Sequence, residues 1–330
     1  MWSSTQETVD ILDLRHYTSA DLRPLLDRES EVWASGMAWD YRSSAEMILR
    51  YIDSKILPGY TAIENGRVVG YTFFVYEGTK GVIGDLFVSA NGHSGAPNSA
   101  HDDEVRMRLL THAIETLQQT PGVRRIEAQL LVHRSGSVSA PFTREGFRVY
   151  PRLFMQLPLA VSKPFYREPL PQLDGIMVRN WTEADFQPAA QCITAAYFGH
   201  IDSDINDQYR TVAGSTRFLN NIVRFPGCGV FDGASSLVAV NRSNGAMAGL
   251  LLASRVRDDV GHVTQICLTP EYRGRGLGKA LMLHCCRGLQ RRNFSQLTLT
   301  VTEANRPAVE LYEHLGFETK RIFDAFVWEG

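Results

Sequence analysis

A glycine-rich turn that carries several cations, residues 268–279, is the segment of this sequence best suited to chemistry. It reads Leu-Thr-Pro-Glu-Tyr-Arg-Gly-Arg-Gly-Leu-Gly-Lys and joins an apolar run, 263–268, to an amphipathic run, 279–291. This order predicts a strand, a turn and the start of a helix. Backbone N–H groups and the positive end of the helix dipole would face one anion, and the glycines would let the backbone approach it. The turn therefore predicts a phosphate or pyrophosphate site.

Two common phosphate-binding loops fit this turn poorly. A P-loop needs a glycine five residues before its Gly-Lys pair and a hydroxyl residue after the lysine, but Arg273 and Ala280 stand there. A dinucleotide fingerprint needs G-x-G-x-x-G and an acidic residue about 20 positions further on. This turn has G-x-G-x-G, and the next acidic residue is Glu303. Another class of phosphate loop is therefore expected, with the pattern R-x-x-G-x-G.

A second motif follows the amphipathic run. Residues 296–301 alternate apolar side chains with threonine, which predicts a strand. Residues 305–317 read Asn-Arg-Pro-Ala-Val-Glu-Leu-Tyr-Glu-His-Leu-Gly-Phe. The spacing of the apolar residues predicts a short helix with one buried face, and Pro307 and Gly316 suit its first turn and its C-terminal end.

In this order and at this spacing, R-x-x-G-x-G and N-x-x-A-x-x-L-Y-x-x-x-G-F resemble the acetyl-CoA loop and the following segment of the GNAT N-acetyltransferase superfamily. The resemblance implies an α/β fold of the α+β kind, with a mixed, mostly antiparallel sheet, splayed central strands and flanking helices. It also implies an acyltransferase that moves an acetyl group from acetyl-CoA to a primary amine of a small molecule. The amine would attack directly and form a tetrahedral intermediate. Acetyl-CoA would be a cosubstrate, and no metal is implied.

The resemblance assigns residues that would hold acetyl-CoA. Backbone groups of the strand end would hold pantetheine, and a backbone N–H near Leu268 would contact the thioester oxygen. Asn305 would contact the cosubstrate near the pantetheine arm, although an asparagine there also suits a helix N-cap. The strand-end residues are Ile266, Cys267 and Leu268; the residues of the pyrophosphate loop are Arg273, Gly274, Arg275, Gly276, Leu277, Gly278 and Lys279.

Two catalytic residues follow from the same resemblance. Tyr312 would protonate the departing thiolate, because a phenol with a pKa of about 10 is matched to a thiol; a tyrosine of the core is the alternative. His262 stands where many family members have a glutamate and would act as the base, unless it is a water-exposed histidine at the start of a strand. Asp202 and Asp204 would favour a cationic amine, or would belong to a solvated loop.

Composition narrows the class of protein. With 330 residues, the chain has the length of about two domains. The 44% hydrophobic and 21% charged residues are ordinary for a globular protein, and a net charge of −2 gives no field that would recruit nucleic acid or membrane. We find no apolar stretch of membrane-spanning length and no signal peptide at the N-terminus. The five cysteines include no C-x-x-C pair, so we expect reduced thiols and a cytoplasmic protein.

The chain divides into two halves with parallel patterns. Each half begins with a strand and a Thr-capped helix, continues with a hairpin turning at Asn65-Gly66 or Asn244-Gly245, and then has an apolar strand. A proline-rich stretch separates them. We therefore expect a GNAT-like domain at 1–157, a linker at 158–174 and a catalytic GNAT domain at 175–330.

The first half lacks the residues that hold acetyl-CoA. No R-x-x-G-x-G follows Val88, and Asp102, Asp103 and Glu104 would repel a pyrophosphate at the next helix start. The chain thus resembles a tandem GNAT protein, arranged as in mycothiol synthase, with a degenerate N-terminal domain. We expect one active site, a small amine as acceptor, and a monomer or homodimer. A non-catalytic acyl-CoA-binding regulator and an acetyltransferase of protein N-termini or lysines remain as alternatives.

Overall fold

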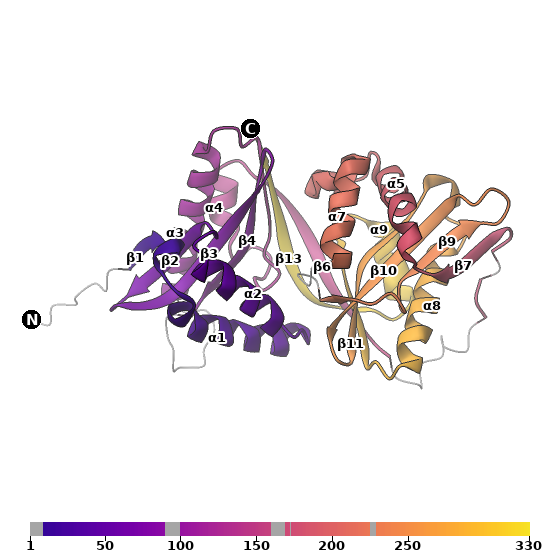
Figure 1. Ribbon diagram of the computed structural model, residues 1–330, viewed down its shortest axis with the longest axis horizontal. Helices are drawn as coiled ribbons and strands as arrows, with labels where there is room; N and C mark the ends of the chain where they lie inside the picture. Colours follow the sequence, from indigo (N-terminus) through magenta and orange to yellow (C-terminus); the bar gives the residue numbers. More distant parts are fainter. Residues whose placement is uncertain (1–8, 90–99, 160–168, 172, 225–228) are drawn as a thin grey trace, which may run out of the picture. The chain divides into compact units, whose positions relative to one another are not determined.

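A computed structural model describes residues 9–89, 100–159, 169–171, 173–224 and 229–330. The chain forms two compact units (Figure 1). The first consists of Met1–Pro151 with Phe323–Gly330, and the second of Arg152–Ile322. Each unit is a mixed sheet with helices packed against it, so the expected fold class is confirmed.

In the first unit the described sheet has the order β1-β2-β3-β4-β5-β13. Neighbouring strands are antiparallel except β4 and β5, which are parallel. The strands are β1 (Asp10–Asp13), β2 (Gly59–Glu64), β3 (Arg67–Glu77), β4 (Lys80–Val88), β5 (Arg125–Gln129) and the end of β13 (Glu318–Glu329). The helices are η1 (Leu14–His16), α1 (Ser19–Met37), α2 (Arg42–Asp53), α3 (Ala100–Gln119) and α4 (Ser139–Arg144).

The second unit repeats this plan with the order β6-β12-β11-β10-β9-β7, and β8 also pairs with β10. Here β11 and β12 are the parallel pair. The strands are β6 (Arg148–Pro158), β7 (Ile176–Asn180), β8 (Val230–Phe231), β9 (Leu237–Asn241), β10 (Met247–Arg257), β11 (Val260–Leu268) and β12 (Gln296–Thr302). The helices are η3 (Glu183–Asp185), α5 (Phe186–Tyr197), α6 (Asp202–Ile205), η4 (Asp207–Arg210), α7 (Val212–Arg224), η5 (Pro270–Tyr272), α8 (Leu277–Arg291) and α9 (Arg306–His314).

The units exchange their last strands, which the expected domains did not include. Residues 152–158 of β6 pair with β12 in the second unit, and residues 325–329 of β13 pair with β5 in the first. The boundary at 157 therefore differs from the observed division, because the strand continues through Pro151 with its apolar side chains buried among those of the second unit. Most of the expected linker, residues 160–168 and 172, lies outside the described residues.

The two parallel strand pairs share one register. Four residues pair in each case, starting with Lys80 opposite Arg125 and with Val260 opposite Gln296. Beyond them, β4 and β11 continue for five residues without a parallel partner, paired only with the antiparallel strand on their other side. The fifth residue of each strand, Gly84 or Thr264, forms a bulge against the preceding antiparallel strand. The expected splay of the central strands is thus present in both units. The shared register makes Leu86 equivalent to Ile266, and the residues that follow them are equivalent in turn.

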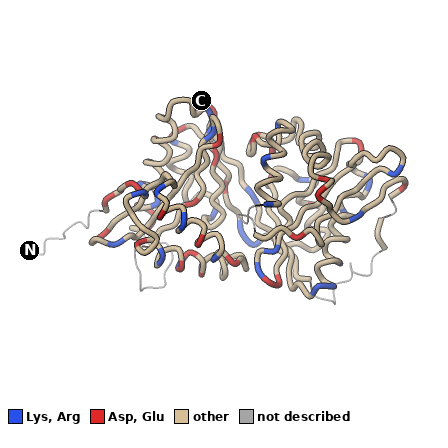
Figure 2. The backbone as a smooth tube through the Cα atoms, in the orientation of Figure 1, with Lys and Arg blue, Asp and Glu red and all other residues tan. Residues whose placement is uncertain are grey.

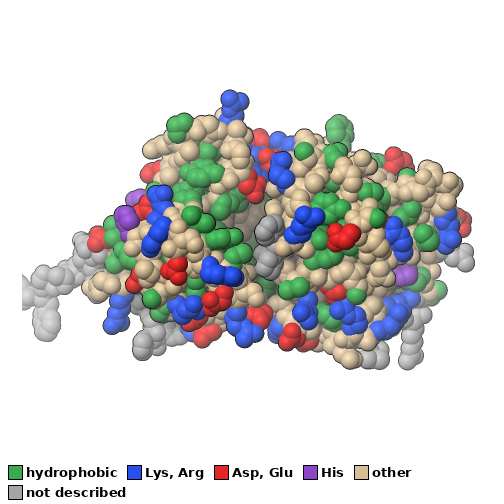
Figure 3. Space-filling model, in the orientation of Figure 1, with side chains coloured by type: hydrophobic (Ala, Val, Ile, Leu, Met, Phe, Trp, Pro, Cys, Tyr) green, Lys and Arg blue, Asp and Glu red, His purple; other side chains and the backbone are tan. Residues whose placement is uncertain are grey.

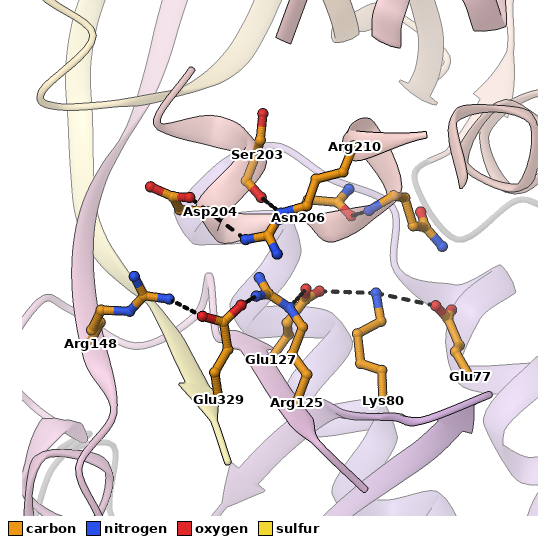
Figure 4. A network of polar contacts seen from close by, with 11 residues as sticks. Glu77, Lys80, Arg125, Glu127, Arg148, Ser203, Asp204, Asn206, Arg210 and Glu329 are labelled. Carbon is orange, nitrogen blue, oxygen red and sulfur yellow. Dashed lines mark hydrogen bonds and ion pairs between the residues drawn. The ribbon is translucent and has the colours of Figure 1, made fainter. Parts of the chain in front are cut away.

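Charged residues of both signs are interspersed along the backbone of each unit (Figure 2), and their side chains are interspersed over the face that is in view (Figure 3). In the first unit, Lys80 lies between Glu77 and Glu127, and Arg125 pairs with Glu127 and with Glu329 of β13 (Figure 4). These ion pairs hold the exchanged strand at its end. No helix in the described ranges combines the length and the apolar character needed to cross a membrane.

Candidate active site

The site is built at the end of β11, where this strand has left β12. Pairing between the two strands stops at Val263 opposite Leu299. Beyond that point, Ile266, Cys267 and Leu268 line a cavity of about 640 Å³ in the second unit. Backbone groups on the open side of a splayed strand can pair with an extended ligand as they would with another strand. The structure thus places all three strand-end residues predicted from the sequence at one cavity.

The glycine-rich loop forms the next wall of the cavity. Gly274 and Gly276 have φ of 71° and 79°, in the left-handed region that favours glycine. Their conformation turns the chain from η5 into α8, whose first N–H groups have no partners within the helix. Gly274, Gly276, Gly278 and Lys279 line the cavity. A helix N-terminus with a cation beside it fits a pyrophosphate, so the chemistry of this wall suits the predicted anion.

Three residues of the predicted pyrophosphate loop have side chains that contact other parts of the protein. Arg273 lines the cavity, but its guanidinium also donates to the carbonyls of Leu268 (3.4 Å) and Ala196. These bonds tie the loop to α5. Arg275 lies over the Tyr272 ring at 5.9 Å and is not among the residues that line this cavity. The side chain of Leu277 is 1% exposed and belongs to the core, so any contact it made with the ligand would come from its backbone.

The helix α9 supplies Asn305 and Tyr312 to the same cavity. The side chain of Asn305 makes no capping hydrogen bond, although the residue occupies the N-cap position. Tyr312 is 5% exposed and packs on Phe317 with ring centroids 5.8 Å apart. Burial, and secondarily the Asp202 carboxylate, raises the pKa of Tyr312, so the phenol keeps its proton at neutral pH. The phenol thus has a proton to donate, but it is a weaker acid than the free phenol whose pKa matches that of a thiol.

His262 lies away from the described cavity lining and is 5% exposed. Its Nδ1 is 2.8 Å from the Thr298 hydroxyl, and its ring stacks on Phe154 at 6.3 Å. Burial lowers the pKa of His262 to about 3, which makes the ring a weak base. The alternative of a water-exposed histidine at the start of a strand is therefore wrong. These surroundings do not favour the predicted role as the base, because His262 is not among the residues that line the cavity where an amine would bind.

The opposite wall of the cavity comes from α5 and the segment that follows it. Most of these residues lie outside the two sequence motifs. Tyr197 lines the cavity and stacks on Tyr209 with ring centroids 4.4 Å apart. Gln265 donates to the Tyr197 hydroxyl at 3.0 Å and accepts from that of Tyr209 at 3.4 Å. His200 lines the cavity beside them. The sequence offers one signal for this wall, a cluster of aromatic and ionisable residues at 197–204, but not the direction in which each side chain points.

Solved structures share this architecture over the full length of the chain. A GCN5-related N-acetyltransferase from Sphaerobacter thermophilus superposes with a TM-score of 0.64 and 16% identity, covering 97% of this chain and 95% of the other. A tandem GNAT protein from the clavulanic acid biosynthesis pathway gives 0.57 and 16%, covering 98% of each chain. The fold is therefore that of two GNAT domains in tandem.

Residues 201–317, which contain most of the cavity wall, match the acetyltransferase (GNAT) family. Mycothiol acetyltransferase from Thermobifida fusca is 39% identical over 97 residues, which are 27% of this chain and 30% of that protein. The [ribosomal protein bS18]-alanine N-acetyltransferase of Escherichia coli K12 is 37% identical over 79 residues, 24% of this chain and 53% of that enzyme. The alignments thus span about a third to a half of these relatives.

Proposed function

We propose that the second unit is an N-acetyltransferase that transfers the acetyl group of acetyl-CoA to a primary amine of a small molecule. One observation carries this proposal. A single cavity brings together the end of the splayed strand, the glycine-rich helix start with Lys279, and the buried phenol of Tyr312. These three parts match the three needs of the reaction: an extended arm, a pyrophosphate and a departing thiolate.

Each part has a separate task in the proposed reaction. The open backbone of β11 would hold the pantetheine arm, and an N–H near Leu268 would stabilise negative charge on the carbonyl oxygen. The α8 N-terminus and Lys279 would bind the pyrophosphate. The Tyr312 hydroxyl would give its proton to the sulfur as the C–S bond breaks. No step requires a protein nucleophile, because the amine attacks the thioester directly.

A thiol-release assay tests the proposal. The full chain would be mixed with acetyl-CoA and a panel of amines: 1,4-diaminobutane, glucosamine and a short peptide that begins with alanine. We expect amine-dependent release of CoA with at least one small amine. Faster turnover of the peptide would favour a protein N-terminal acceptor instead. Acetyl-CoA binding without turnover on any amine would favour a regulator, and failure of acetyl-CoA to bind would overturn the proposal.

We also propose that the protein works in the cytoplasm. Cys192, Cys267, Cys285 and Cys286 are buried free thiols, as expected in a reducing compartment. Immunodetection in fractionated cells would check this, and recovery from an extracellular or periplasmic fraction would contradict it.

A further inference from the structure

His200 and Asp202 form a histidine–carboxylate pair at the cavity, on the segment between α5 and α6. The His200 Nδ1 lies 3.5 Å from Asp202 Oδ2, and the backbone N–H of Asp202 donates to the same Nδ1 at 3.2 Å. Asp202 Oδ1 accepts from the hydroxyl of Thr302, at the end of β12. The pair is partly buried, with 26% and 14% of the two side chains exposed. The carboxylate is thus fixed on one side and faces the imidazole on the other.

An acetyl acceptor must lose a proton before it can attack. A free alkylamine has a pKa of about 10, so only about one molecule in a thousand is neutral at pH 7. His262 is buried away from the cavity lining and is a weak base. His200, in contrast, lines the same cavity as Tyr312. We propose that His200, oriented by Asp202, accepts the proton of the acceptor ammonium; this inference rests on the proposed acetyltransferase function.

The other ionisable groups around the pair favour this assignment. The Tyr197 ring lies edge-on to the His200 ring at 5.4 Å, Tyr209 stacks behind it, and Tyr312 faces the cavity from α9. Burial foremost, with the Asp202 charge among the lesser causes, raises the pKa of all three tyrosines, so they remain protonated. The thiol of Cys267, on β11, also has a raised pKa, chiefly from its hydrogen bond with Cys192 and from burial. These groups therefore keep their protons, and the His200 imidazole, paired with Asp202, is the group at this wall that we assign as proton acceptor.

The proton balance closes with two groups. The ammonium gives one proton to His200 Nδ1, the ring nitrogen that accepts the Asp202 N–H in the neutral ring, and the resulting imidazolium is stabilised by the Asp202 carboxylate 3.5 Å away. The amine nitrogen then forms the C–N bond, and the C–S bond breaks. Tyr312 protonates the thiolate and recovers a proton from the nitrogen that has become the amide. The net products are the amide, CoA thiol and one proton, which leaves His200 to solvent.

A pH-rate profile of matched variants tests this role. His200→Gln keeps a polar side chain but cannot take up a proton, and Asp202→Asn removes the charge that faces the ring. Asp204→Asn is the control, because Asp204 is not among the residues that line the cavity and belongs instead to a solvated segment: half of its side chain is exposed, and it points to Arg210 at 3.6 Å (Figure 4). The probe is the panel amine that wild type acetylates fastest. Acetyl-CoA affinity of each variant, measured by calorimetry, reports whether the site is intact.

We expect His200→Gln to lower kcat/KM about 10²-fold at pH 7. The loss should shrink about tenfold per pH unit and disappear about two units higher, near pH 9, because the neutral amine then arrives from solution. Asp202→Asn should lose about tenfold, and Asp204→Asn should stay within about threefold at every pH.

A His200→Gln profile parallel to that of wild type would overturn the proposal. So would equal losses in Asp202→Asn and Asp204→Asn, or loss of acetyl-CoA binding in both His200→Gln and Asp202→Asn, since the pair would then be structural. In these cases wild-type turnover would still stand. Absence of turnover by wild type on the whole panel would instead sink the proposed function, and this inference with it.

Discussion

The two units splay their parallel strands at the same place, but they treat the open strand differently. In the first unit, the Leu86 carbonyl accepts a hydrogen bond from His133 at 2.9 Å, and Phe87 packs into the core. In the second, Ile266 and the smaller Cys267 occupy the equivalent positions and line a cavity. In the first unit, side chains of the unit itself thus contact the residues whose equivalents line the cavity of the second unit.

The helix that follows the open strand shows the same contrast. The first turn of α8 carries Lys279 after two glycines with positive φ, whereas that of α3 carries Asp102 and Asp103. Residues 90–99, where a loop of the first unit would be compared, lie outside the described residues. Tyr312 has a counterpart in Phe142 of α4. Phe142 packs on Phe147 as Tyr312 of α9 packs on Phe317. The first unit thus has the same fold without the groups that we propose bind acetyl-CoA and protonate its thiolate.

The polar residues at equivalent positions of β4 and β11 differ as well. Where the second unit has the neutral Gln265, the first has Asp85, which accepts from Tyr41 at 2.6 Å and from Tyr71 at 3.0 Å. Glu29 accepts from the same Tyr71 at 2.6 Å and is fully buried. Burial first, and the Asp85 charge second, raises the pKa of Glu29 well above its ordinary value. Glu29 therefore holds its proton more tightly in the folded first unit than an ordinary glutamate does.

Placing an acidic residue in the first turn of α8, as in the first turn of α3, should reduce acetyl-CoA affinity more than any other change proposed here. Lys279→Asp makes this change. We expect acetyl-CoA affinity to fall about 10²- to 10³-fold, since a cation beside the proposed pyrophosphate site is replaced by a repulsive group. Calorimetric titration measures the loss. Thermal stability should hold, because an acid suits a helix N-terminus.

Lys279→Gln is the matched control for charge removal alone and should lose less affinity than Lys279→Asp. Equal affinity of wild type and Lys279→Asp would show that the pyrophosphate binds elsewhere.

Tyr312→Phe gives the second unit the side chain found at Phe142. We expect kcat to fall about 10²-fold while the Kd for acetyl-CoA stays within about twofold, because only the proton donor is removed. Steady-state kinetics and calorimetry separate the two quantities. Tyr197→Phe is a control on the opposite wall and should leave most of kcat. Unchanged turnover in Tyr312→Phe would make Tyr312 a residue of the core.

The two units should respond to pH in opposite directions. The folded-state pKa of Glu29 is raised, so its contribution to stability is present below its ordinary pKa of 4.5 and is lost as pH rises through the folded value. The pKa of His262 is lowered from 6.5 to about 3, so its contribution is present above pH 6.5 and is lost as pH falls toward 3. For His262 this amounts to about 2 kcal/mol between pH 8 and pH 5.

Glu29→Gln and His262→Gln remove these two responses one at a time. Relative to wild type, Glu29→Gln should gain stability as pH rises, and His262→Gln should gain it as pH falls. Urea unfolding at a series of pH values measures both differences. A difference from wild type that does not change with pH would contradict the assigned protonation state of that residue.

Asn305→Ala should have the smallest effect. We expect acetyl-CoA to bind about five- to tenfold more weakly, because one polar contact is lost. The melting temperature should change little, since the side chain makes no capping bond. A clear drop in melting temperature at unchanged affinity would instead assign Asn305 to helix capping.

Much of the fold and of the cavity was predictable from sequence because local signals encode them. Asn65 and Gly66 turn the first hairpin with positive φ, and Gly274 and Gly276 turn the loop in the same way. The strand exchange was not predictable, since the alternation of apolar residues along β13 indicates a strand but does not name its partner. The surroundings of His262 were also missed. Its burial depends on Phe154, which reaches it only through the exchanged strand β6.

The central claim is that one unit binds acetyl-CoA and the other does not. Calorimetric titration of the full chain with acetyl-CoA measures this directly as a stoichiometry. The account predicts one molecule bound per chain, and none at the same concentrations in Lys279→Asp. Two molecules per chain, or one that persists undiminished in Lys279→Asp, would contradict it.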